Sequence, residues 1–261
     1  MKSISNLDKF IDKIKAGTLC KGLVITLNDL TVSELAAEAG YDFTWIDMEH
    51  APVTIESALQ HVMAVKGTDC APLVRVPWNK AEVIKPVLDL APAGIIIPMV
   101  NTAEEAQAAV LACRYPPQGI RGCFVRRANR FGKTPFAEYI KASESEPMVI
   151  IQIETIEGVR NLDEILKVPG IGSICIGPLD LSGSMGKLGQ TDDPEVNSQI
   201  DIICEKVKAA GILLGTASWP FEPWKKRGLN WIALTSDFAS IVAYSKIILS
   251  DKQVIQSACQ G

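Results

Sequence analysis

Short, uninterrupted apolar runs recur along the chain, separated by longer stretches in which apolar positions repeat with a helical period. Each run is rich in Val, Ile and Leu, as expected for strands that are buried on both faces of a parallel sheet. The runs that predict strands occupy residues 22–27, 43–47, 73–76, 94–99, 148–153, 173–176, 212–215 and 231–234.

The stretches around these runs predict amphipathic helices at residues 31–39, 54–65, 81–90, 102–113, 159–166, 194–210, 221–227 and 238–249, with one more in residues 1–17. Repeated strand–helix units favour an α/β fold, a single (β/α)8 TIM barrel with an N-terminal helix. The alternative is an open doubly wound sheet, which often carries a phosphate loop after its first strand. Residues 26–29 (TLND), where the first predicted strand ends, contain no glycine and so do not form such a loop. In the glycine-rich segment 183–189, Lys187 is followed by Leu rather than Ser or Thr, so we interpret it as a flexible loop.

The chain of 261 residues is close to the roughly 250 that one such barrel needs, so we expect a single domain over residues 1–261. One connection is unusually long, between the fourth and fifth runs. Loops of that length are commonly functional or contain helices of their own. We expect this connection to arch over one end of the barrel.

Composition narrows the possible classes of function. A chain that is 48% hydrophobic and 21% charged can bury a sizeable core, and a net charge of −4 gives no basic field for nucleic acid or anionic lipid. The N-terminal segment lacks the apolar core of a signal peptide and no stretch is long enough to span a membrane, so we expect a cytoplasmic protein. Seven cysteines without a C-x-x-C pair indicate reduced thiols, with Cys175 buried in a strand.

Ionisable residues end several of the apolar runs, which is where barrel enzymes place their active sites. Glu154 ends the fifth run, and Asp180 follows the sixth. Their carboxylates are therefore expected at the ends of neighbouring strands. Two oxygen ligands with open positions suit Mg²⁺ or Mn²⁺. Salt bridges or helix caps explain a bare carboxylate pair equally well, and Asp180 is placed to cap the segment after it.

His50 and Arg75 belong to the same rim. His50 follows a strand end with Asp47 and Glu49 nearby to orient its imidazole, as a general base requires, although a structural histidine is the alternative. Arg75 lies within an apolar run and needs a carboxylate or an anionic ligand as partner. None of the runs ends in lysine, which disfavours Schiff-base chemistry and favours a metal as electron sink.

Taken together, these segments resemble the HpcH/HpaI aldolase family of class II pyruvate aldolases. The resemblance extends in order over nearly the whole chain, through residues 46–52 (IDMEHAP), 74–77 (VRVP), 114–117 (RYPP) with 119–122 (GIRG), 152–155 (QIET) and 176–182 (IGPLDLS). It implies a (β/α)8 barrel with a divalent ion (Mg²⁺, Mn²⁺ or Co²⁺). It also implies a homo-oligomer built from dimers that exchange their last helix, commonly assembled into a hexamer.

The resemblance assigns a role to each candidate residue. It implies Glu154 and Asp180 as metal ligands, His50 as catalytic base assisted by Asp47, and Arg75 as contact to the pyruvate oxygen. The remaining implied substrate contacts are Gln152, the backbone of Gly177, Pro178, Leu179 and Asp180, and Asp89, which would approach a neighbouring subunit's site.

The implied reaction is reversible aldol cleavage of a 4-hydroxy-2-oxo acid of the sugar-acid or dicarboxylate type, through a metal-stabilised enolate, to pyruvate and an aldehyde. Residues 126–132 (RRANRFG) resemble the sugar-acid aldolases of the family, whereas Leu179 stands where relatives carry a small residue and narrows the pocket. Two alternatives stay open: an acyl-CoA lyase of the malyl-CoA or citramalyl-CoA type, using Arg126 to Arg130 for the nucleotide, and a non-catalytic barrel without metal affinity.

Overall fold

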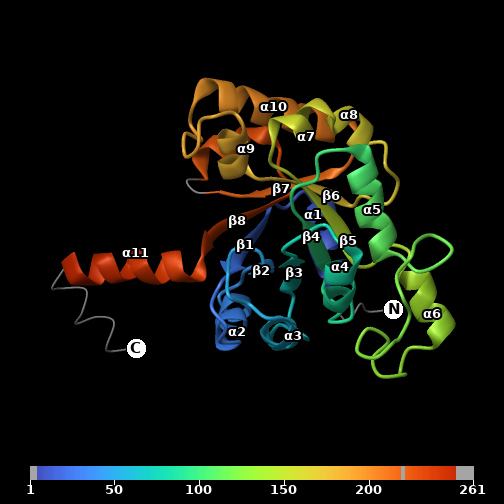
Figure 1. Cartoon of the computed structure of the whole chain (residues 1–261). Helices are drawn as coiled ribbons and strands as arrows, with labels where there is room; N and C mark the ends of the chain where they lie inside the picture. The colour runs from blue at the N-terminus through green and yellow to red at the C-terminus, as the bar shows by residue number, and fades with distance from the viewer. Residues whose placement is uncertain (1–4, 219–220, 251–261) are drawn as a thin grey trace.

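The computed structural model describes residues 5–218 and 221–250 and forms a closed barrel in which every strand pairs in parallel with the next and β8 pairs with β1 (Figure 1). This confirms the (β/α)8 prediction. The strands are β1 (Cys20–Ile25), β2 (Phe43–Asp47), β3 (Ala71–Arg75), β4 (Gly94–Ile97), β5 (Met148–Ile153), β6 (Ser173–Ile176), β7 (Leu213–Ala217) and β8 (Trp231–Ser236).

Helices alternate with these strands and surround the barrel. They are α1 (Leu7–Lys15), α2 (Thr31–Glu38), α3 (Ile55–Ala64), α4 (Ala81–Leu88), α5 (Ala103–Cys113), α6 (Phe136–Ala142), α7 (Ile156–Arg160), α8 (Leu162–Ile165), α9 (Pro178–Ser184), α10 (Pro194–Ala209) and α11 (Asp237–Ser250), with a 3-10 helix at Glu222–Arg227. Capping explains two sharp starts: Thr54 and Thr102 each accept a backbone N–H of the first turn and complete a capping box.

Two apolar clusters fill the molecule. The larger lies between the strands and the surrounding helices, and the smaller fills the barrel interior, where Phe10 of α1 packs edge-on against Phe43 with ring centroids 5.7 Å apart. Gly215 is required by this interior, because a Cβ there would lie within 2.4 Å of three ring atoms of Trp231. The N-terminal helix therefore closes the end of the barrel at which the strands begin.

The long connection between β4 and β5 lies at one end of the barrel, as expected, and contains a helix that was not predicted. Because α5 ends and β5 begins at the N-terminal end of the barrel, the segment after α5 lies at that end, and it contains α6, which the sequence pattern did not reveal. The guanidinium of Arg127 is buried there and donates to the carbonyls of Leu90 and Ala91. The connection thus packs across the end of α4, away from the strand ends that carry the candidate chemistry.

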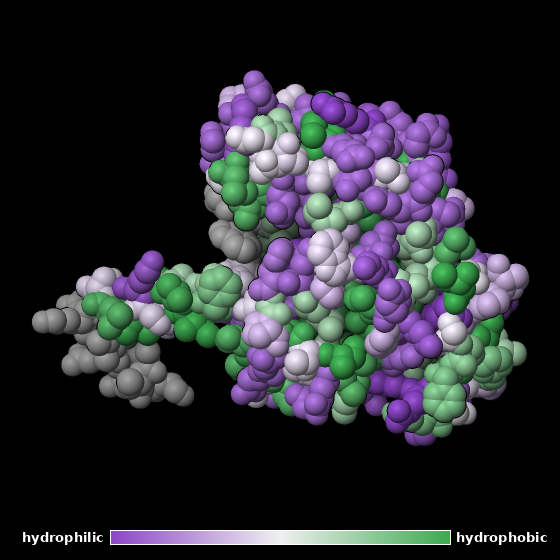
Figure 2. Space-filling view, in the orientation of Figure 1, coloured by the Kyte–Doolittle hydropathy of each residue, from purple (hydrophilic) through white to green (hydrophobic). Residues whose placement is uncertain are grey.

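Helix α11 projects away from the barrel (Figure 1), and Figure 2 shows apolar residues along it, interspersed with polar ones. Its exposed large side chains are Phe238, Ile241, Val242, Tyr244, Ile247 and Leu249. Within the described residues no helix is long and apolar enough to span a membrane. The six cysteines in the described part are free, and Cys175 is buried in β6 as predicted.

The predicted flexible loop after α9 is a compact turn without the features of a phosphate loop. Lys187 Nζ lies 2.7 Å from Asp193 and 2.8 Å from Glu195, and the Lys187 N–H donates to the Ser182 carbonyl. The lysine charge is therefore already matched by carboxylates.

Candidate active site

Asp47 and Arg75 form a bidentate ion pair at the C-terminal end of the barrel. They are register partners on β2 and β3, and Arg75 donates to both Asp47 oxygens, at 2.9 Å from Nε and 2.6 Å from Nη2. Arg75 also lies over the Trp45 ring, with its Cζ 5.1 Å from the ring centroid. A planar guanidinium held at two edges and one face has little rotational freedom.

Glu49 completes this group from the loop after β2. Its Oε2 lies 2.9 Å from Arg75 Nη1, an ion pair without hydrogen-bond alignment. Burial raises the pKa of Glu49 to about 7, against the lowering effect of Arg75 and with a further rise from Asp47 and Asp180. Arg75 is thus shared by two carboxylates, the partners expected for it.

Asp47 and Glu49 were the two carboxylates expected to orient the imidazole of His50, and Glu49 is the one that lies beside the ring. Asp47 accepts the backbone N–H of His50 at 3.4 Å, whereas the imidazole is 63% exposed and has its Nε2 3.7 Å from Glu49 Oε2. The carboxylate beside the ring is therefore Glu49. The imidazole is open to a ligand in the mouth of the barrel, at the strand ends.

Glu154 is almost fully buried, and its two oxygens are held by different elements. Oε1 accepts the backbone N–H of Met99 at 2.7 Å, and Oε2 accepts a hydrogen bond from the Gln152 amide. Burial raises the pKa of Glu154 to about 7, opposed by these two hydrogen bonds and increased by Glu49 and Asp180. Such a carboxylate is destabilised as an anion until a cation compensates its charge.

Met99 adopts a left-handed conformation, with φ 56°. The sequence pattern predicted a strand through this residue, but β4 ends at Ile97 and Pro98 offers no N–H to a neighbouring strand. A positive φ in a non-glycine residue costs of order 1 kcal/mol and is commonly found at functional sites. Here it directs the Met99 N–H at Glu154.

Gly177 lies against the same carboxylate at the start of α9. A Cβ at this position would lie 2.7 Å from both Glu154 Cβ and Glu154 Oε2. Asp180 lies in the first turn of α9, is exposed and makes no capping hydrogen bond, so the capping alternative does not hold. Its negative charge contributes to the raised pKa of Glu154.

These residues fit a divalent cation. Glu154 and Glu49 both have raised pKa values, and the negative charge of Asp180 contributes to both increases. In addition, Gln152 Oε1 and Glu49 Oε2 are buried without a hydrogen-bond partner. No set of three or more His, Cys, Asp or Glu residues in the described ranges forms a ready-made metal cluster. The arrangement is one of few protein ligands with open positions, as Mg²⁺ prefers.

Comparison with known proteins agrees with this geometry. A profile described as HpcH/HpaI aldolase/citrate lyase matches residues 21–241. The chain belongs to this family of aldolases and lyases. It is 36% identical over 248 residues to a hydroxypyruvate/pyruvate aldolase of Roseobacter denitrificans, covering 93% of this chain and 96% of the relative.

Two further similarities cover most of the chain. A 5-keto-4-deoxy-D-glucarate aldolase of Enterobacter sp. (strain 638) is 39% identical over 239 residues, covering 88% of this chain and 92% of the relative. The crystal structure of an HpcH/HpaI aldolase/citrate lyase family protein from Burkholderia cenocepacia J2315 superposes with a TM-score of 0.88 at 27% identity, over 95% of this chain and 99% of that one.

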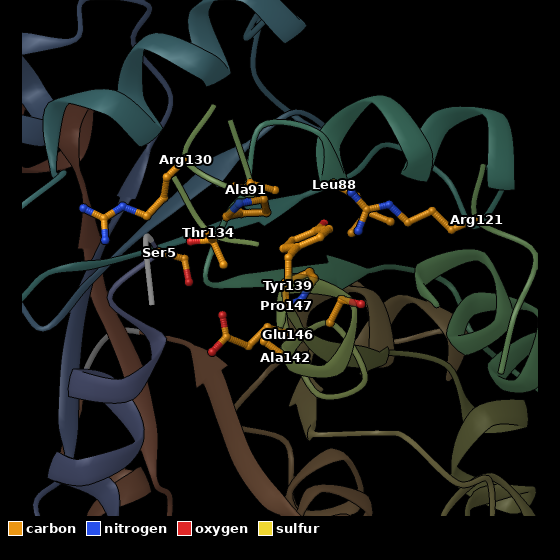
Figure 3. Close-up of a pocket in the computed structure, with 13 residues that line it drawn as sticks. Ser5, Leu88, Ala91, Arg121, Arg130, Thr134, Tyr139, Ala142, Glu146 and Pro147 are labelled. Carbon is orange, nitrogen blue, oxygen red and sulfur yellow. The ribbon is translucent and has the colours of Figure 1, made fainter. Parts of the chain in front are cut away.

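In this member of the HpcH/HpaI family, Asp89 lies apart from the other candidate residues. It follows α4 at the N-terminal end of the barrel and accepts a hydrogen bond of 2.9 Å from the buried Arg121. Figure 3 shows a cavity at the same end, where Arg121 and Tyr139 lie beside Leu88 and Pro147. Asp89 therefore does not reach the mouth of its own barrel.

Two contributors to the site, Met99 and Trp45, were missed from the sequence, and the role of Gly177 was predicted only in part. Met99 acts through its backbone and Trp45 through a face that stacks on Arg75, and neither role leaves a residue-type signal in an apolar run. Gly177 was predicted to contact the substrate through its backbone. Its lack of a side chain also leaves the room that the Glu154 carboxylate occupies. The glycine that directly follows a buried strand was the one available signal for this close approach.

Proposed function

We propose that this HpcH/HpaI family member is a divalent-metal-dependent aldolase that reversibly cleaves a 4-hydroxy-2-oxo acid to pyruvate and an aldehyde. The observation that carries the proposal is Glu154, a buried carboxylate whose two oxygens are held by the Met99 N–H and the Gln152 amide, with no basic partner and with its pKa raised to about 7. A structural salt bridge would supply a basic side chain at this point. Instead, the groups around Glu154 are an amide, a backbone N–H and further carboxylates.

Glu154 and Asp180 are the residues that would hold the ion, which can be Mg²⁺, Mn²⁺ or Co²⁺. When bound, such an ion supplies positive charge opposite the negative charge that develops on the keto oxygen of the 2-oxo acid. Gln152 fixes the Glu154 carboxylate by its amide donor, and its Oε1 is left for a substrate or water contact.

The remaining residues act on the substrate directly. Arg75, locked by Asp47, is positioned to donate to the pyruvate oxygen at a fixed angle. At the start of α9, Pro178 has no N–H, so the backbone donors for the pyruvate carboxylate are Leu179 and Asp180. His50, exposed in the mouth beside Glu49, takes the proton of the 4-hydroxyl during cleavage and returns it during synthesis.

A homo-oligomer is part of the proposal. Helix α11 leaves the barrel with its large apolar side chains exposed, and such a surface on an isolated helix is a marker of association. A second copy that exchanges this helix would bury it. Asp89 lies at the end of the barrel opposite the candidate active site of its own subunit. In such an oligomer it would approach the active site of a neighbouring subunit.

The acyl-CoA alternative receives less support. It requires Arg126 to Arg130 as a basic surface for nucleotide phosphates, but Arg127 is buried with its donors directed at main-chain carbonyls. This segment also lies at the N-terminal end of the barrel. The non-catalytic alternative predicts no affinity for divalent metals and is decided by the same experiment as the aldolase.

The decisive experiment separates enolate formation from aldehyde chemistry. The protein is incubated with Mn²⁺ and pyruvate in D₂O, and loss of the methyl proton signal is followed by NMR. We expect metal-dependent exchange in the wild type and a loss of at least a hundredfold in Glu154→Gln, with Glu157→Gln on the outer part of α7 as matched control. Exchange that needs no metal, or that survives in Glu154→Gln, contradicts the proposal.

A further inference from the structure

The cavity at the N-terminal end of the barrel lies at the opposite end from Glu154 (Figure 3). It has a volume of about 70 Å³ and is lined by the polar side chains of Arg121 and Tyr139 together with apolar residues that include Leu88 and Pro147. About 10–15 Å³ of such volume is enough for one water molecule, so the cavity has room for a ligand of several non-hydrogen atoms.

Arg121 enters this cavity with one of its hydrogen-bond donors unused. Its Nη2 donates to Asp89 at 2.9 Å, and its Cζ lies 4.5 Å from the centroid of the Tyr115 ring. Its Nε is buried and has no hydrogen-bond partner. In Figure 3 the Arg121 side chain extends toward Leu88 and Tyr139. A buried donor of this kind is costly to leave without an acceptor, so the cavity is the place where an acceptor is missing.

Two more buried arginines support the wall of the same cavity. Arg114 donates to the Pro147 carbonyl at 3.2 Å and Arg127 to the Ala91 carbonyl at 3.4 Å, and both acceptors belong to residues that line the cavity. In the described part of the chain, both guanidinium groups bond to main-chain carbonyls and to no carboxylate. Burial lowers the pKa of both arginines, as expected for cations that lack a counter-ion.

The charges around the cavity therefore do not balance. The three buried guanidinium groups share one direct carboxylate partner, Asp89, while the lining adds one further carboxylate, Glu146, and one exposed cation, Arg130. A neighbouring subunit that reaches Asp89 does not supply the missing charge by contact, because the three buried arginines are between 3% and 8% exposed and are covered by their own chain. A small anion inside the cavity would supply it.

We infer that this cavity binds a small monocarboxylate, whose oxygens accept from Arg121 Nε and whose short apolar tail packs against Leu88, Ala142 and Pro147. The apolar part of the lining favours such a ligand over inorganic phosphate, whose oxygens point in every direction and would lose their hydration against these side chains. The inference does not depend on the proposed aldolase function, since the cavity and Glu154 lie at opposite ends of the barrel.

The test is a titration of the Mg²⁺-loaded protein with propanoate, followed by saturation-transfer NMR, with propanamide as the uncharged ligand of the same shape. We expect propanoate to bind at least tenfold more tightly than propanamide, and phosphate to compete with it at least tenfold less well than unlabelled propanoate does. Equal binding of the amide overturns the inference, because the cavity then does not select an anion. Tighter binding of phosphate overturns the choice of a monocarboxylate.

Variants locate the bound propanoate. Arg121→Gln should weaken it at least tenfold. Ala142→Leu fills the cavity and keeps every charge, so it should have the same effect and decides the matter even where Arg121→Gln fails to fold; Ala137→Leu, exposed on the same helix and outside the lining, is its matched control and should stay within twofold of the wild type. Binding that survives in Ala142→Leu overturns the inference, as does binding that is lost in Glu154→Gln, since propanoate would then occupy the candidate active site.

Discussion

A single methyl group added at Gly177 tests whether the position of Glu154 controls the site. The Cβ of Gly177→Ala would lie 2.7 Å from Glu154 Oε2, about 0.7 Å closer than the ordinary contact of 3.4 Å. The backbone at Gly177 has φ −102°, which alanine tolerates, so the substitution reports the side-chain contact and not backbone strain.

The expected magnitude follows from what has to move. Glu154 is pinned at one oxygen by the Met99 N–H and at the other by Gln152, so it cannot withdraw without losing a hydrogen bond. Overpacking of this kind costs about 1–3 kcal/mol. A ligand displaced by ~1 Å commonly reduces catalysis by ~10²-fold. We expect Gly177→Ala to weaken Mn²⁺ binding by at least tenfold and kcat/KM by about a hundredfold.

The measurements are calorimetric titration with Mn²⁺, kcat/KM for aldol cleavage and thermal unfolding of the metal-free protein. Gly183→Ala is the matched control on the same helix, since its Cβ would meet only the exposed side chain of Leu188, at 3.1 Å from Cδ1 and 3.9 Å from Cβ, and would not touch Glu154. If Gly177→Ala binds Mn²⁺ within twofold of the wild type and keeps its kcat/KM, the close approach of Gly177 does not position Glu154.

Three further predictions concern other parts of the molecule. Glu154→Gln should weaken Mn²⁺ binding at least tenfold while leaving the thermal midpoint of the metal-free protein equal or higher, because a poorly solvated charge is removed; a midpoint lowered by several degrees would contradict this. Burial lowers the pKa of His61, so below pH ~6.5 the unfolded chain binds a proton that the folded chain does not, and stability falls as pH drops. Denaturant unfolding from pH 7.5 to 5 should show a steeper loss in the wild type than in His61→Asn, by up to ~1.4 kcal/mol per pH unit, and equal slopes would argue against it. Ile241→Asp on α11 should reduce the oligomer mass measured by light scattering, and an unchanged mass would show that this helix face is not an interface.

The strands and the positions of most site residues could be predicted from the sequence. Runs such as 43–47, 148–153 and 173–176 coincide with β2, β5 and β6, because strands buried on both faces need continuous apolar residues and little else competes for that pattern. The same runs placed Asp47, Glu154 and Asp180 at the end of the barrel where parallel strands finish. The pattern did not predict α6. This helix is short and lies within a polar connection, so too few apolar residues repeat with a helical period to mark it.

Tertiary structure alone decided which groups act on which. Asp47 lies close in sequence to His50 but pairs through space with Arg75, because neighbouring parallel strands bring these two residues into register. Glu154 obtains its environment from Met99, which is 55 residues away in the chain, and from Gly177. Residue types set the available charges and the fold class. Burial and register, which depend on the closed barrel, decided which of those charges lack a partner and so require a ligand.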